Sequence, residues 1–138
     1  MNSQTRISLA LLCVFLTSGA AALDTSEPIL CVSIDINECV DGAECKRVLA
    51  EEVNAPTFIR IDLKNKQLLV RKDGEPTEIE HVEEIEGRIV MQGVEEGNPN
   101  VDDGTGWTLT IEKDTARMVA TVSMRQAAVV MFGACTEL

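Results

Sequence analysis

The stretch from Gly106 to Ser123 constrains the fold more than any other part of the chain. Apolar and polar side chains alternate along it with a period of two, which is typical of a strand with one buried face. A polar segment, Lys113–Ala116, interrupts the alternation in the middle. The apolar row comprises Trp107, Leu109, Ile111, Met118, Ala120 and Val122. The pattern predicts a β-hairpin whose inward face carries the only tryptophan of the chain.

The other segments are shorter versions of the same design. Each is a run of alternating or buried apolar residues bounded by turn residues such as Gly, Pro, Asn and Asp. The expected strands are Ile29–Asp35, Thr57–Leu63, Gln67–Arg71, Arg88–Val94 and Ala127–Phe132, beside the central hairpin. With seven to nine short strands and no crossover helix, the chain predicts an all-β fold. We expect a small antiparallel meander closed into a barrel or a sandwich.

Two stretches need separate treatment. Thr77–Glu86 has the capping-box spacing and the three-residue apolar spacing of a helix. Its apolar and acidic residues also alternate, and it lies between two expected strands. We therefore favour a strand that turns at Glu84–Gly87. Ile36–Lys46 is expected to be a cysteine-containing loop, and Glu95–Gly106 the longest exposed loop. Gly93 marks a bulge or a close approach of neighbouring groups within its strand.

The N-terminal residues have the three-part order of a secretory signal. A short segment with one positive charge precedes the apolar run Ile7–Leu16, and small residues follow as far as Ala22. The apolar run is shorter than the roughly 20 residues that span a bilayer. The sequence therefore predicts a cleaved signal peptide over residues 1–22, a single exported β domain over 23–138, no membrane span after cleavage, and a secreted or periplasmic location.

Four cysteines follow the predicted signal, an even number that indicates two disulfides in an oxidising compartment. Cys39 and Cys45 flank an Asp-Gly turn, so we predict that they pair locally. Cys31–Cys135 would then tie the first strand to the last, and edges joined in this way suit a barrel. The alternative pairing is Cys31–Cys45 with Cys39–Cys135.

The chain is strongly acidic, with 23 Asp and Glu against 12 Lys and Arg and a formal net charge of −11. A field of this sign disfavours nucleic acid and anionic lipid and favours basic partners or cations. It also keeps an exported protein soluble.

One acidic string has a specific resemblance. Asp35-Ile36-Asn37-Glu38-Cys39 resembles the opening of calcium-binding EGF modules, in which such side chains supply oxygen ligands to the cation. The resemblance covers five residues, and those modules need six closely spaced cysteines, so the chain is not assigned to the family. A calcium site would use Asp35, Asn37, Glu38 and Asp41; no other cofactor is expected.

The residues offer no recognisable catalytic set. His81 is the only histidine, no Gly-x-Ser-x-Gly elbow occurs, and no cysteine is left to act as a nucleophile. A phosphate-binding glycine loop and a zinc ligand set are also missing from the sequence. We therefore expect a binding protein and not an enzyme, and assign no catalytic residue.

We expect a module that binds a basic protein; the alternatives are a lipocalin-like carrier of a small apolar ligand and a calcium-stabilised structural domain. In the first, an acidic face engages a basic protein, by analogy with periplasmic lysozyme inhibitors, although the chain lacks their tyrosine-containing loop. That face would comprise Glu83, Glu84, Glu95, Glu96, Asp102 and Asp103. In the second, a lipocalin-like barrel carries a small apolar ligand in a cavity beside Trp107. The favoured role for Trp107, however, is to fill the core together with Phe58, Phe132, Met91 and Met118.

Overall fold

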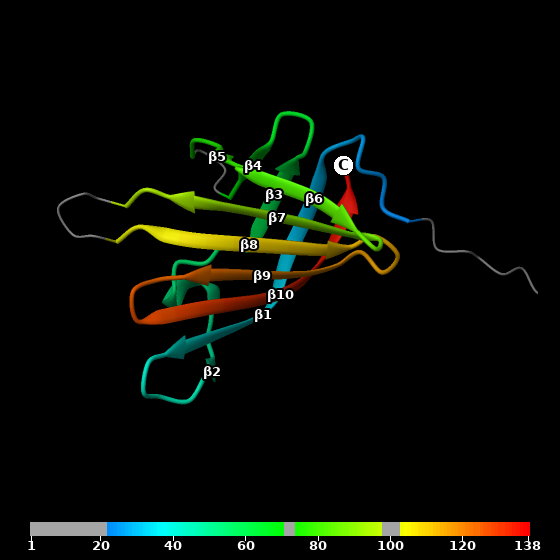
Figure 1. Ribbon diagram of the computed structural model, residues 1–138. Helices are drawn as coiled ribbons and strands as arrows, with labels where there is room; N and C mark the ends of the chain where they lie inside the picture. The colour runs from blue at the N-terminus through cyan, green and yellow to red at the C-terminus, as the bar shows by residue number, and fades with distance from the viewer. Residues whose placement is uncertain (1–21, 71–73, 98–102) are drawn as a thin grey trace, which may run out of the picture.

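The computed structural model describes residues 22–70, 74–97 and 103–138 (Figure 1). They form one antiparallel sheet of ten strands in the order β5-β4-β3-β1-β10-β9-β8-β7-β6, with β2 paired to β1 outside this path. The strands are β1 (Ile29–Val40), β2 (Lys46–Arg47), β3 (Phe58–Asp62), β4 (Gln67–Leu69), β5 (Thr77–Glu78), β6 (His81–Ile85), β7 (Arg88–Glu95), β8 (Thr105–Glu112), β9 (Arg117–Ser123) and β10 (Ala127–Glu137). A short 3₁₀ helix, η1 (Ala50–Glu52), precedes β3. The fold is an all-β antiparallel meander curled into a half-barrel.

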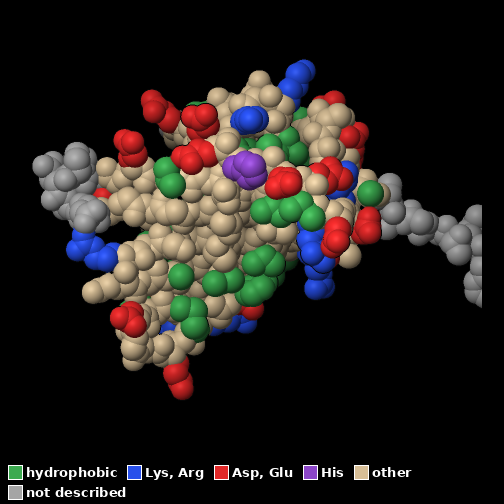
Figure 2. Space-filling view, viewed as in Figure 1, with side chains coloured by type: hydrophobic (Ala, Val, Ile, Leu, Met, Phe, Trp, Pro, Cys, Tyr) green, Lys and Arg blue, Asp and Glu red, His purple; other side chains and the backbone are tan. Residues whose placement is uncertain are grey.

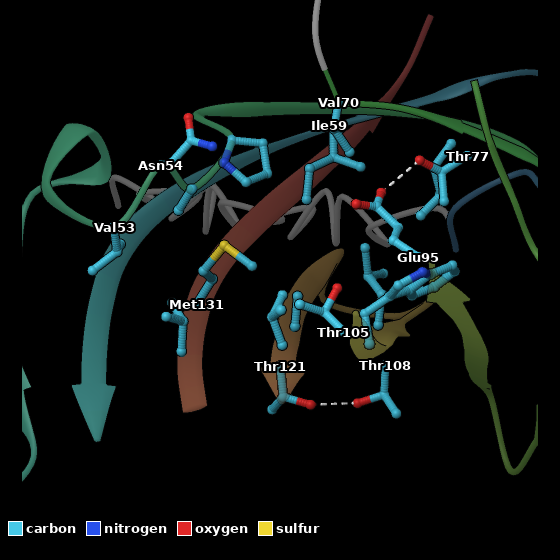
Figure 3. Close-up of a pocket in the computed structure, with 18 of the residues that line it drawn as sticks. Val53, Asn54, Ile59, Val70, Thr77, Glu95, Thr105, Thr108, Thr121 and Met131 are labelled. Carbon is cyan, nitrogen blue, oxygen red and sulfur yellow. Dashed lines mark hydrogen bonds between the residues drawn. The ribbon is translucent and has the colours of Figure 1, made fainter. Parts of the chain in front are cut away.

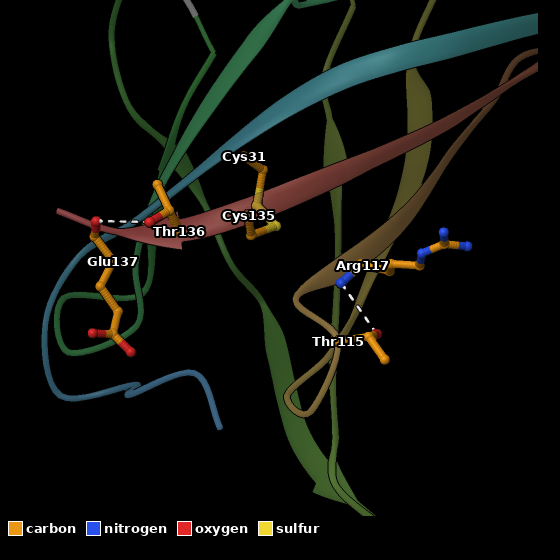
Figure 4. Close-up of a disulfide and its surroundings, with 6 residues drawn as sticks. All are labelled: Cys31, Thr115, Arg117, Cys135, Thr136 and Glu137. Carbon is orange, nitrogen blue, oxygen red and sulfur yellow. Dashed lines mark hydrogen bonds between the residues drawn. A yellow bond between two sulfur atoms is a disulfide. The ribbon is translucent and has the colours of Figure 1, made fainter. Parts of the chain in front are cut away.

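The first and last long strands, β1 and β10, lie side by side through the centre of this sheet. Their register pairs Cys31 directly with Cys135, and the two Cα atoms are 4.0 Å apart. The Cys31–Cys135 disulfide joins the strands there (Figure 4). The second disulfide, Cys39–Cys45, closes the turn after β1. Both predicted pairings are present.

A bulge bends β1 where it crosses the half-barrel. The register with β10 shifts between Ser33 and Asp35, so Ile34 turns outward with 65% of its surface exposed. Gly133 faces this bulge. A Cβ atom there would collide with the carbonyl oxygen of Val32 and lie 2.7 Å from Met118 Cε, so the close approach requires glycine.

The predicted central hairpin is confirmed as β8 and β9. Trp107 faces Val122, Leu109 faces Ala120 and Ile111 faces Met118 across the two strands. The inward residues form the middle of the core, in which Leu109 and Met118 are both 2% exposed. Burial of this row follows from the period-two alternation that the sequence displays.

The Thr77–Glu86 segment is extended, as favoured from the sequence, and it joins the two edges of the sheet. β5 pairs with β4 and β6 pairs with β7. Between them, Ile79 N–H donates to the carbonyl of Lys66 (2.9 Å) and Glu80 N–H to that of Gln92 (3.1 Å). Ile79 is 1% exposed, so its burial holds the bend in place. Left-handed Glu86 (φ 49°) and Gly87 (φ 76°) then make the tight turn into β7.

Three expectations from the sequence are wrong in detail. The strand predicted to end at Asp35 continues to Val40, and the last strand continues past Phe132 to Glu137, because β1 and β10 pair along their whole length. Phe58 and Phe132, expected beside Trp107 in the core, are 58% and 45% exposed. Strand alternation places them on the outer face, where Phe58 pairs with Val32 and Phe132 with Val119.

Residues 1–21 of the predicted signal peptide lie outside the described residues. Within the part of the chain that is described, no helix has the length and apolar character needed to cross a membrane.

Candidate functional site

A cavity of about 450 Å³ lies inside the half-barrel. Residues of β3 and β4 line it, as do residues of β8, β9 and β10. These two groups of strands belong to different parts of the curled sheet (Figure 1). Its lining is mostly apolar. The aliphatic, proline and methionine side chains are Val53, Ala55, Pro56, Ile59, Leu68, Val70, Leu109, Ala120, Val122, Met124, Val129 and Met131.

Trp107 contributes the aromatic surface of the cavity. It lies on β8 opposite Gly93 of β7, and only 9% of its surface is exposed. A Cβ atom on Gly93 would lie 2.6 Å from Trp107 Cζ2, so the indole packs flat over the glycine. Gly93 is therefore the predicted close-approach point. It is not a bulge, because the β7–β8 register is continuous from Arg88 to Glu95.

The indole nitrogen of Trp107 has no hydrogen-bond partner among residues 22–70, 74–97 and 103–138. Nε1 is buried and makes no hydrogen bond to any atom of the described residues. An indole N–H is a donor only, and a buried donor without an acceptor is a rare and costly feature of a folded protein.

Polar groups surround one end of the apolar lining (Figure 3). Thr77 Oγ1 donates to Glu95 Oε1 at 2.8 Å and so holds this carboxylate at the rim. Thr105 lines the same region, and Asn54 lies on the opposite wall. Among the described lining residues Glu95 is the only charged side chain. The site thus combines an apolar body with a few polar groups, which is the usual composition of a small-molecule site.

The wall formed by Val53–Thr57 is held in place before any ligand arrives. Asn54 adopts a left-handed conformation (φ 51°), which asparagine tolerates well, and it redirects the chain after η1. Ser33 anchors the end of the wall, because its Oγ donates to the carbonyl of Pro56 (2.9 Å) and its N–H to that of Thr57 (2.9 Å). These contacts fix the wall against β1.

Glu83 and Glu84, two of the acidic residues predicted to form a partner-binding face, do not share one face. Glu83 and Glu84 are adjacent on β6 and so project from opposite faces of the strand. Glu83 Oε2 lies 3.6 Å from His81 Nε2, and Glu84 Oε1 is 2.8 Å from Lys113 Nζ. Figure 2 shows carboxylates on both sides of the histidine along one margin of the molecule.

The remaining acidic candidates surround the start of the β7–β8 connection. Glu95 belongs to the cavity rim, whereas Glu96 and Asp103 are exposed. Asp102 lies outside the described residues.

The residues predicted to hold calcium lie along and just after β1. Asp35 Oδ1 is 2.9 Å from Arg47 Nε, and Glu38 Oε2 is 3.3 Å from Lys46 Nζ, so both carboxylates already face cations. Asn37 and Glu38 are neighbours on a strand and point to opposite faces, and Asp41 lies in the following turn. The described residues contain no group of three side chains arranged to hold a metal ion. The calcium site stays a prediction.

Several site residues escaped the sequence analysis. From the sequence, the Val53–Thr57 wall was interpreted only as the end of a short element, and Thr77 only as a candidate helix cap. Thr105 had a usable signal, because it lies two residues before Trp107 and therefore shares its face. The other contacts join segments far apart in the chain, so no local pattern reports them.

A scan against protein-family models, a search of curated proteins and a search of solved structures each return no match to this chain. The ligand is therefore inferred from the shape and chemistry of the cavity itself.

Proposed function

We propose that the protein binds a small, mainly apolar molecule in the cavity beside Trp107 and acts as an exported carrier or sensor of that molecule. The observation that carries the proposal is a mostly apolar cavity of about 450 Å³ inside the half-barrel, with Trp107 among the residues that line it. Protein interiors are normally packed to the density of organic crystals, and ligand sites occupy roughly 300–1,000 Å³. A space of this size and composition is more than a packing defect.

The disulfides support the exported location that is part of the proposal. Two disulfides, one of them joining the first and last long strands, are typical of secreted and periplasmic proteins. We therefore place the binding activity outside the cytosol, in agreement with the predicted signal peptide. The chemistry of the site favours binding over catalysis, since Glu95 is the only titratable side chain among the described lining residues.

The test uses a neutral fluorescent probe, N-phenyl-1-naphthylamine, whose emission rises in apolar surroundings. Saturable binding should be accompanied by a change in the emission of Trp107, the only tryptophan. Ala120→Leu, which places bulk in the cavity, should abolish binding. Ala134→Leu on β10, at an outward position paired with Val32, is the matched control and should leave binding unchanged.

No saturable binding to the wild-type protein, or equal binding to a folded Ala120→Leu variant, would refute the proposal. Circular dichroism establishes whether each variant is folded. If Ala120→Leu does not fold, Val122→Phe on the same wall replaces it.

A second candidate function is the binding of a basic protein. The net charge of −11 and the position of β6 at one end of the strand order favour it, because exposed Glu83 lies there. Glu83→Lys combined with Glu96→Lys should weaken binding to a cationic envelope protein, and the loss should shrink at high salt. Glu51→Lys on η1 is the control. Unchanged affinity in the double variant would exclude this surface.

A further inference from the structure

We infer that Met124 is a modification site at the mouth of the cavity, where a peroxide oxidises its side chain to methionine sulfoxide and so lowers the affinity for an apolar ligand. With hydrogen peroxide, the thioether sulfur attacks one peroxide oxygen and the O–O bond breaks. The proton of the transferred oxygen passes to the departing hydroxide, which leaves as water. The sulfur is oxidised by two electrons and the peroxide is reduced by two. This inference rests on the proposed binding function.

The position of Met124 follows from the pairing of three neighbouring strands. It comes two residues after Val122 of β9, so it continues the inward row of that strand. Its N–H donates to the carbonyl of Ala127 (2.8 Å), which holds this backbone beside β10. The register of β8 with β9 places it opposite Thr105, which pairs with Glu95 of β7. All three side chains line the cavity, so they form one row across its mouth.

Met124 is the apolar member of this row. Thr105 presents a hydroxyl and Glu95 a carboxylate, and the row that contains Trp107 lies about 7 Å deeper along the strands. A methionine side chain is flexible and apolar, whereas its sulfoxide is polar. Oxidation would therefore make the whole row polar, and an apolar ligand would lose the apolar contact that it has there.

Exposure makes the modification selective. Four methionines follow the predicted signal peptide, and their exposed fractions are 0% for Met91, 2% for Met118, 2% for Met131 and 41% for Met124. The three buried side chains meet a dissolved oxidant only when the structure opens, whereas the fourth meets it in the folded state. The four cysteines of the same region are joined in disulfides, so they present no thiol to the oxidant.

The test treats the folded protein with dilute hydrogen peroxide and compares it with untreated protein. Mass spectrometry of proteolytic fragments should find one added oxygen atom, on the fragment that contains Met124. The dissociation constant for N-phenyl-1-naphthylamine should rise by about fourfold, the factor that corresponds to the loss of one buried methylene group. Treatment with methionine sulfoxide reductases A and B should restore the original affinity.

Variants assign the effect to this side chain. Met124→Leu keeps an apolar side chain of similar size without sulfur, so it should bind the probe like the wild-type protein and should not respond to peroxide. Met124→Gln places a polar group at the mouth and should weaken binding by about fourfold without any oxidant. Val119→Gln is the matched control, because Val119 is also 41% exposed but lies on the outward face of β9; it should leave the affinity unchanged.

The outcomes separate this inference from the proposed function. If the probe does not bind the untreated protein, the proposed function itself fails. The inference fails, and the binding function stands, if a buried methionine is oxidised first or if the oxidised protein binds the probe as tightly as before. It also fails if Met124→Leu loses affinity on peroxide treatment, because another residue is then responsible. Circular dichroism before and after oxidation establishes that the protein remains folded.

Discussion

Opening the Cys31–Cys135 disulfide should remove much of the stability of this domain. The bridge joins residues 104 positions apart, and the chain-entropy expression for a loop of that length gives about 4.7 kcal/mol at 25 °C. The Cys39–Cys45 bridge spans 6 positions, for which the same expression gives about 2.2 kcal/mol. Single domains are stable by only about 5–15 kcal/mol, so losing the longer bridge should bring the protein close to unfolding.

The assay compares the free energy of unfolding of one variant with its disulfide oxidised and with the same disulfide reduced. The two forms have the same sequence, so no substitution contributes to the difference in stability. A Cys39→Ala/Cys45→Ala variant retains only the long bridge, and a Cys31→Ala/Cys135→Ala variant only the short one. Urea unfolding of each variant, oxidised and reduced, yields two free-energy differences. The difference for the long bridge should exceed that for the short one by about 2.5 kcal/mol. Equal differences would refute the loop-entropy reasoning.

Three further predictions concern packing, acid stability and calcium. Gly93→Ala should destabilise the protein by about 1–3 kcal/mol and alter the Trp107 emission, because the new Cβ overlaps the indole. The control is Gly106→Ala on β8, where a Cβ meets nothing within 4 Å. It should leave both the urea midpoint and the emission unchanged. Hydrogen bonds from the backbone and side chain of Asn65 hold the pKa of Asp62 below its ordinary value of 3.8. The stabilisation of the fold by these hydrogen bonds is therefore present above pH 3.8 and is lost as the pH falls through the lower pKa of the folded state. An NMR titration should find this low pKa in the wild-type protein and its return toward the ordinary value in Asn65→Ala. If the calcium site forms, calcium should raise the melting temperature and Asp35→Ala should abolish the shift, whereas equal melting with calcium and with chelator would exclude the site.

The candidate site could be predicted only in part. Trp107 was predicted to face inward because it belongs to the apolar row of an alternating strand. A cavity beside Trp107 was expected only under the hypothesis of a lipocalin-like carrier. Glu83 and Glu84 were assigned to one acidic face by charge alone, and strand alternation places them on opposite sides of β6. Phe58 was assigned to the core by residue type alone, and its pairing with Val32 places it outside.

The sequence by itself determined the class of fold and favoured the disulfide pairing that the structure contains, with one alternative pairing left open. Period-two alternation and turn residues are local properties, and they dictate which segments are strands wherever those strands lie. The count and spacing of the cysteines favoured one local bridge and one that joins the first and last strands.

Only the tertiary structure decided that the interior stays open. The bulge at Ile34, the bend at Ile79 and the anchored wall at Val53–Thr57 set how tightly the sheet curls, and these depend on partners far away in the chain. Glu95 and Thr77 meet at the cavity rim for the same reason. Local pattern specifies which face of a strand is buried, whereas the curvature of the whole sheet decides how much space that buried face encloses.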